Sequence, residues 1–163
     1  MTTITTDTIW EALQTVKDPE IPVVSVIEMG IVREVTVDDD LGAVHVKMTP
    51  TFSGCPALDV MRRDIETAVR ELGVTAVTVE TILTPPWTSD WITEEARVKL
   101  KAFGLAPPPC HGGNIEITFF DVVPCPRCDS KNTSIRNTFG STLCRAIYYC
   151  NECQDAFEQF KPL

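Results

Sequence analysis

Two Cys-x-x-Cys pairs constrain this chain more than any other feature. Cys125-Pro-Arg-Cys128 and Cys150-Asn-Glu-Cys153 are separated by 21 residues. Two intervening residues let both thiolates of a pair point into one tetrahedral site from a tight knuckle, and a β-hairpin between the pairs would bring the knuckles together. The spacing predicts a zinc ribbon in which thiolates fill all four positions, so that no position is open for catalysis. A single iron held by the same thiolates, as in rubredoxin, is the alternative.

The segment that carries these cysteines is too small to fold on apolar packing alone. About 40 residues cannot build a self-sufficient core, whereas a structural zinc site contributes ~10–16 kcal/mol. The position after each second cysteine, where knuckles often place glycine, holds Asp129 and Gln154. The chain has seven cysteines, and in a reducing compartment such a set indicates metal binding or thiol chemistry rather than disulfides.

The residues before this segment have the periodicity of a compact α/β layer. The predicted order is α-β-β-α-β-α with a mixed sheet, because the first two strands suit a hairpin and a strand-helix-strand passage implies a parallel crossover. The predicted elements are helices at 8–17, 58–73 and 93–104 and strands at 30–37, 43–49 and 76–83. We expect an α/β domain at 1–106, a Pro/Gly linker at 107–114 and the ribbon at 115–163, whose β-type runs are 115–123, 134–139 and 145–149.

Charge and hydropathy exclude several classes of protein. The net charge is −9, and a chain this acidic is a poor non-specific binder of nucleic acid because it lacks the cations that displace phosphate counterions. Residues 124–163 carry 5 basic and 4 acidic groups, which gives the ribbon no basic stripe. No apolar run approaches the ~20 residues of a membrane span, and the N-terminus lacks a signal peptide. We therefore expect a cytoplasmic protein that binds neither membrane nor nucleic acid.

One isolated cysteine has a setting that suggests function. Cys55 stands in Ser53-Gly54-Cys55-Pro56, between a predicted strand and a predicted helix. If Pro56 is the first helical residue, Cys55 becomes the N-cap, where helix N–H groups and the helix dipole favour a thiolate. Such a thiol can bind a soft metal, accept sulfur or attack carbon. The alternative is a small buried core residue.

Two pairs of residues are further candidates. Asp18 and Glu20 place two carboxylates near one turn, where they can serve acid–base chemistry or simply shape the turn. Trp87 and Trp91 lie four residues apart after Pro85-Pro86. They can pack as a lid on the core or form an exposed face that docks a partner.

The remaining thiols lie close to the ribbon in sequence. Cys144 precedes Cys150 by six residues and is either a small strand residue or a secondary thiol with a ligand or reactive role. Cys110-His111 follows the proline spacer. We expect an exposed linker pair there, with metal ligation as the alternative.

Two sets of motifs resemble known families. The N-terminal part resembles the small iron–sulfur cluster assembly domain (domain of unknown function 59 type). The motifs that carry this resemblance are Asp18-Pro-Glu-Ile-Pro22, Gly30-Ile-Val32, Thr49-Pro-Thr51, Gly54-Cys-Pro56 and Pro86-Trp-Thr-Ser-Asp-Trp91. The run Phe139-Gly-Ser-Thr-x-Cys144, followed by the second cysteine pair, is similar to the PaaD family, an accessory component of the bacterial phenylacetyl-CoA epoxidase.

The resemblance implies an accessory role in the monooxygenase system of aerobic phenylacetate degradation. In that system the di-iron centre belongs to another component, and the flavin and iron–sulfur cluster belong to the reductase. A PaaD-like protein would then help to assemble iron or an iron–sulfur cluster for the oxygenase or reductase, would not be catalytic alone, and would hold that cargo transiently, as a monomer or a homodimer. In related domains the cysteine that matches Cys55 is the functional thiol, and Asp18 and Glu20 lie in the shared acidic motif. The alternative is a non-catalytic interaction subunit with a purely structural zinc.

Overall fold

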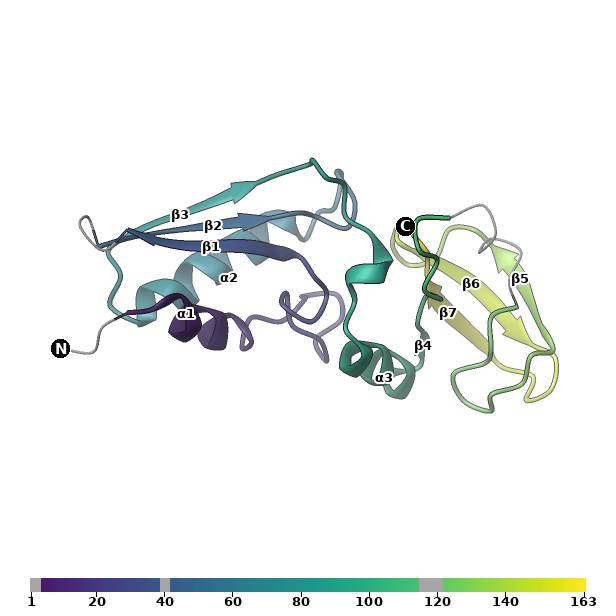
Figure 1. Cartoon of the computed structure of the whole chain (residues 1–163). Coiled ribbons are helices and arrows are strands. Elements are labelled where there is room, and N and C mark those ends of the chain that lie inside the picture. Colours follow the sequence, from purple (N-terminus) through teal and green to yellow (C-terminus); the bar gives the residue numbers. More distant parts are fainter. Residues whose placement is uncertain (1–3, 39–41, 115–121) are drawn as a thin grey trace. The chain divides into compact units, whose positions relative to one another are not determined.

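A computed structural model describes residues 4–38, 42–114 and 122–163 of the chain (Figure 1). Contacts between Cα atoms divide it into two compact units, Met1–Trp87 and Thr88–Leu163. Within the described ranges, every helix is too short or too polar to cross a lipid bilayer.

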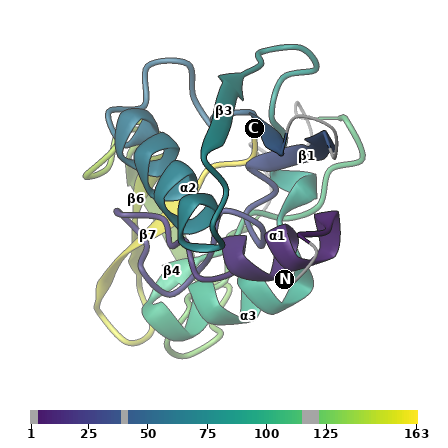
Figure 2. The ribbon, with the colours of Figure 1, turned by 90° about the vertical axis from the view of Figure 1, so that its left-hand side faces the viewer.

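The first unit is a two-layer α/β structure. Its elements are α1 (Thr6–Leu13), β1 (Val32–Asp38), β2 (Ala43–Met48), α2 (Leu58–Glu71) and β3 (Ala76–Thr81). The strand order is β1-β2-β3, with β1 antiparallel and β3 parallel to the central strand β2. Both helices cover the same face of the sheet (Figure 1), and α1 lies next to α2 (Figure 2). The predicted mixed sheet is therefore confirmed.

The core of this unit consists of apolar side chains that recur at every second position of a strand and along one face of a helix. Strand β2 buries every second residue, Val44, Val46 and Met48, against the helices, while His45 and Lys47 on its other face are only half-buried. Helix α2 buries Met61, Ile65 and Val69, which recur every four residues along one face.

The two tryptophans have different environments. Trp87 is 5% exposed, and its Nε1–H donates a hydrogen bond of 2.8 Å to the carbonyl of Met29. Trp87 thus packs into the core, the first of the two alternatives, and a docking role for its side chain is wrong because the indole is buried and its polar atom is paired. Trp91 is half-buried, and its docking role stays a prediction.

The second unit contains the ribbon together with a helix that precedes it. Its elements are η1 (Ser89–Trp91), α3 (Glu94–Phe103), β4 (Leu105–Ala106), β5 (Thr133–Asn137), β6 (Arg145–Cys150) and β7 (Ala156–Phe160). The strand order is β4-β7-β6-β5. Helix α3 starts at the Thr93 cap and ends at Gly104, whose φ of +92° suits glycine. The β-type run predicted at 115–123 lies almost wholly outside the described residues.

The short strand β4 links the region of α3 to the ribbon. Leu105 and Ala106 pair in parallel with Glu158 and Gln159 of β7, so the residues that follow α3 extend the ribbon sheet. The compact units consequently divide between Trp87 and Thr88, upstream of the linker expected from the proline run. The limits 1–106, 107–114 and 115–163 stay a prediction about pieces that fold independently.

We expect Trp87→Phe to lower the free energy of unfolding by about 2 kcal/mol. The substitution leaves the buried Met29 carbonyl without its donor and leaves a void beside the smaller ring. Denaturant unfolding followed by circular dichroism measures the loss. The control Trp91→Phe, at a half-buried position, should cost less, and equal losses would contradict the core role of Trp87.

Candidate functional site

The four ribbon cysteines meet in one place. Sγ of Cys125 lies 3.8 Å from Sγ of Cys153, and Sγ of Cys128 lies 3.5 Å from Sγ of Cys150. All four sulfur atoms lie within 4.8 Å of one another. A tetrahedral ion with metal–sulfur bonds of ~2.3 Å requires sulfur atoms ~3.8 Å apart. The four thiols therefore fit one tetrahedral metal site, as the spacing predicts.

The two knuckles turn through left-handed residues that are not glycine. Asp129 has φ of +60° and Gln154 has φ of +58°, a conformation that is costly for residues with a Cβ. At Asp129 the side chain has its own contact, since its carboxylate pairs with the Lys101 ammonium on α3. Arg127 of the first knuckle forms an ion pair with Asp155, which follows the second. One ion pair thus joins the two knuckles to each other, and the other joins the first knuckle to α3.

The clustered thiols compete for ionisation. N–H groups of Cys153 and Glu152 lower the pKa of Cys150 to about 7, whereas desolvation and the neighbouring thiols raise the pKa of Cys153 to about 12. Four thiolates at this spacing repel one another strongly unless a cation stands between them. Metal binding must displace protons, so the affinity for metal falls as the pH falls.

Cys144 is separate from this cluster. It lies in the turn before β6 and is half-buried, with its Sγ 3.1 Å from the hydroxyl of Thr142. The group of four cysteines that can share one ion does not include it. Its role as a secondary thiol stays a prediction.

The side chains of Cys110 and His111 have different environments in the structure. Cys110 is exposed as expected, but the exposed position expected for His111 is wrong, because its side chain is 2% exposed. Its Nε2 lies 3.1 Å from the Leu163 carbonyl oxygen and 3.2 Å from the Thr88 hydroxyl, and its Nδ1 accepts a hydrogen bond from Gly113. His111 therefore joins three segments of the second unit.

The surroundings of His111 look like a catalytic triad but cannot act as one. The Asp90 carboxylate lies 3.7 Å from Nδ1, on the side opposite the Thr88 hydroxyl. Because the Gly113 N–H donates to Nδ1, the ring proton resides on Nε2, which cannot then accept a proton from threonine. Although partial burial opposes it, hydrogen bonds from the His111 and Gly112 N–H groups lower the pKa of Asp90. The network is structural.

Several motif segments of the first unit meet at one end of its sheet. Met48 of β2 is in register with Thr81 of β3, so the loops that follow these parallel strands leave the same end. The Ile82 N–H donates to the Met48 carbonyl, and the Thr49 N–H donates to that of Ile31, just before β1. In open α/β sheets, ligands bind at the carboxyl ends of parallel strands. This end, with the loop 49–57, is the second candidate site.

Cys55 lies in this loop, though not at the helix cap that the sequence suggests. The first helical hydrogen bond of α2 runs from Met61 to Ala57, and Ala57 is the N-cap. The Leu58 N–H instead closes a tighter turn on the Cys55 carbonyl at 3.2 Å, which places Cys55 ahead of the helix and removes it from the first turn. Cys55 is half-buried, so the alternative of a fully buried core residue does not hold.

The acidic motif shapes a turn. Asp18 is 8% exposed, and its Oδ1 accepts hydrogen bonds of 2.8 Å from the Glu20 N–H and 3.2 Å from the Ile21 N–H. This is the Asx-turn geometry that Asp favours. Glu20 is half-buried. The carboxylate of Asp18 is therefore engaged in holding the loop that leads toward β1.

Thr49 is a residue that the sequence reasoning did not single out as functional. It is 1% exposed at the end of β2, and its hydroxyl has no hydrogen-bond partner among the residues that the structure describes. A buried hydroxyl left unpaired costs ~1–3 kcal/mol. Only its place in the motif Thr49-Pro-Thr51 could have drawn attention to it.

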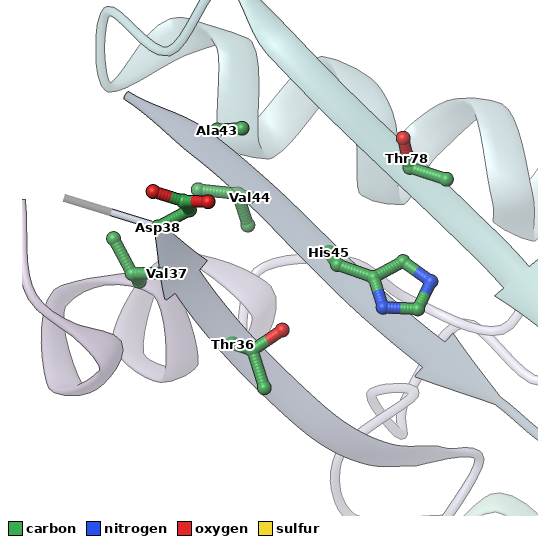
Figure 3. A pocket seen from close by; sticks show the side chains of 7 residues that line it. All are labelled: Thr36, Val37, Asp38, Ala43, Val44, His45 and Thr78. Atoms are coloured by element: carbon green, nitrogen blue, oxygen red, sulfur yellow. The ribbon is translucent and has the colours of Figure 1, made fainter. Parts of the chain in front are cut away.

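A shallow pocket of about 730 Å³ lies on the open face of the sheet (Figure 3). Thr36, His45 and Thr78 line it from three adjacent strands, and His45 is held by Glu80 at 3.1 Å. Asp38 ends β1 and Ala43 begins β2, so the pocket lies away from the sheet end that carries the Cys55 loop. It is not part of either candidate site.

Comparison with known proteins finds a matching family for each of the two units. Residues 6–81 match the iron–sulfur cluster assembly protein family, and residues 119–161 match the PaaD zinc beta ribbon domain. A protein of Escherichia coli, provisionally named as the D component of 1,2-phenylacetyl-CoA epoxidase, is 41% identical over 94% of this chain and 90% of its own length. The chain belongs to the PaaD family.

Relatives of the first unit alone agree with this assignment. An Fe-S protein maturation auxiliary factor of Porphyromonas gingivalis is 39% identical over 59% of this chain and 90% of its own length. A conserved hypothetical protein of Thermotoga maritima has a similar structure, with a TM-score of 0.54 and 33% identity over 61% of this chain and 98% of that one. The PaaD family member described here thus carries an Fe-S maturation type of domain and a four-cysteine ribbon.

We expect Cys150→Ser to remove the bound metal and to unfold the ribbon while the first unit stays folded. Three remaining thiols cannot complete the site, and the ribbon core includes Cys150 itself. Metal analysis and hydrogen exchange of the full chain measure the two effects. Cys110→Ser is the matched control, and equal metal content in both variants would contradict the site.

We expect Thr49→Val to raise the free energy of unfolding by about 1 kcal/mol, because it replaces an unpaired buried hydroxyl with a methyl group of similar size. Denaturant unfolding measures the change, with Thr51→Val as control. A clear loss of stability would show that the hydroxyl has a partner after all.

Proposed function

We propose that this protein is the maturation subunit of a phenylacetyl-CoA ring 1,2-epoxidase and helps to assemble iron or an iron–sulfur cluster in the oxygenase or the reductase. One observation carries the proposal. The relative named for the epoxidase covers nearly the whole chain, and the first unit matches the iron–sulfur assembly family. The joint presence of both parts is more specific than either part alone.

In this proposal Cys55 is the thiol that holds the cargo. Its position in an exposed loop at the carboxyl end of β2 supports the role, because a transferred ion or cluster must reach the thiol from solvent and leave again. Asp18 fixes the turn of the acidic motif, to which Glu20 also belongs. Cys144, in the second unit, is a candidate for a second thiol, and a homodimer could supply a second Cys55.

The ribbon has a different part in this proposal. Cys125, Cys128, Cys150 and Cys153 would hold zinc, which has no redox chemistry and favours four thiolates in a tetrahedral structural site. The fit of the sulfur positions supports this assignment. A closed site has no position for substrate, so the ribbon would serve binding to the client and not transfer of cargo.

We further propose that the chain has no turnover of phenylacetyl-CoA by itself. Oxygen activation needs a redox metal with open positions, a flavin or another cofactor. The sequence has only two histidines, of which His111 is committed to a structural network and His45 is paired with Glu80 on a strand surface. Such residues offer no support for a carboxylate–histidine di-iron site.

A second function, a pure interaction subunit, is favoured by the closed cysteine cluster. It predicts a colourless protein with one zinc after anaerobic purification. The maturation role predicts that anaerobic reconstitution with iron and sulfide gives a visible absorption band that Cys55→Ser loses.

We expect Cys55→Ser to fold normally and to lower the iron content of the client at least ~10-fold. Cells that express the epoxidase with only this variant provide the oxygenase and reductase for metal analysis. Cys110→Ser, which replaces another accessible cysteine, should leave the iron content unchanged. Full metallation of both components by Cys55→Ser would refute the role of this thiol.

A further inference from the structure

The turn between β5 and β6, residues 138–144, exposes apolar side chains that the fold does not require. Phe139 is 61% exposed and Leu143 is 52% exposed, and Ile135 on the adjoining strand β5 is 51% exposed. Burying a large apolar side chain is favourable, so exposed ones on the turn of a small ribbon indicate a surface that binds something else.

Hydrogen bonds to the Glu158 carboxylate of β7 hold this turn. The Glu158 carboxylate accepts hydrogen bonds from the N–H and the hydroxyl of Ser141, at 2.7 and 3.1 Å, and from Arg145 at 3.0 Å. Although partial burial opposes it, these donors hold the pKa of Glu158 below its usual value. Gly140 fits so closely that a Cβ there would lie 2.7 Å from the Glu158 carboxylate and 2.9 Å from Arg145.

Lys161 fixes the turn from the other side. Its ammonium lies 5.0 Å from the centre of the Phe139 ring and donates a hydrogen bond of 2.9 Å to the Leu143 carbonyl. Its backbone N–H donates to the Cys144 carbonyl. Phe139 is thus exposed but held in place, which lowers the entropy cost of binding through it.

Cations lie near the Phe139 anchor. Residues 130–151 contain no acidic residue. Of their basic residues Arg145 is buried and paired with Glu158, which leaves Lys131 and Arg136, and Lys161 lies over the Phe139 ring. Arg136 stacks over the Tyr149 ring at 4.9 Å on the same hairpin. An aromatic anchor surrounded by cations is complementary to an apolar pocket bordered by carboxylates. Three cations spread over a hairpin are too few for a nucleic-acid groove.

We propose that the 138–144 turn, with Phe139 as its anchor, is the surface through which the ribbon binds a client component of the epoxidase, at an apolar pocket with an acidic border. This inference rests on the proposed function and names the contact surface that the function needs. The first unit would then act on cargo while the ribbon holds the client.

The test measures binding of the full-length protein to the purified oxygenase and to the purified reductase. Phe139→Ala should weaken binding to one of them and raise the dissociation constant at least ~30-fold, as for an interface hot spot. Phe103→Ala is the matched control, since Phe103 is 47% exposed on α3 of the same unit. Arg136→Gln should slow association and reduce its salt dependence. Zinc content and circular dichroism confirm that each variant is folded.

Each alternative result overturns a different statement. If Phe139→Ala binds as tightly as Phe103→Ala, the turn is not the contact, although the maturation role can still hold. If the wild-type protein binds neither component, the proposed function itself fails. If Phe139→Ala abolishes self-association or nucleic-acid binding while client binding is unchanged, the occupant is a second copy or a nucleic acid, and the client assignment is wrong.

Discussion

The second unit depends on the meeting of four cysteine sulfur atoms within 4.8 Å of one another. Among the described residues, one buried cluster includes Val123, Cys125, Cys150 and Phe157 of the ribbon and Ala106 of β4, with Tyr148 packed against it. Two of the metal ligands are therefore also core residues. Such a cluster supplies too little apolar burial to fold the ribbon alone, and repulsion among the thiols works against it unless a cation is bound. A metal ion held by the four thiols would therefore couple its binding to folding of the ribbon.

The cysteines of the two units have different surroundings. In the ribbon all four thiols of the cluster can satisfy one ion, which gives stability and leaves no coordination position for another group. In the first unit Cys55 stands half-buried in a loop at the carboxyl end of β2 and is not a member of that group. The neighbouring Thr49 hydroxyl is buried without a partner among the described residues.

Periodicity and spacing predicted the parts that depend on local chemistry. The cysteine pairs, the alternation along β2 and the apolar face of α2 all matched the structure because each depends on a short-range repeat. Strand β4 is only two residues long, and β7 includes Glu158 and Gln159, so neither has a strand-like pattern; they form because they pair with each other and with β6. The burial of His111 depends on Leu163, 52 residues away, and the helix start after Cys55 depends on a turn that competes with the helical hydrogen bond. The His111 contact is too distant in sequence to leave a local signal, whereas the turn at Cys55 is local and differs from the helix cap that Pro56 suggests.

The most direct test of the account separates maturation from turnover. The oxygenase and reductase are purified from cells that express this protein and from cells that lack it, and their iron content and epoxidation rate are measured before and after the pure protein is added. If the protein acts in maturation, components from the first cells are fully loaded and respond little to added protein, whereas one component from the second cells is poor in iron. If fully loaded components still require this protein for each turnover, it is a coupling subunit, and the maturation account is contradicted.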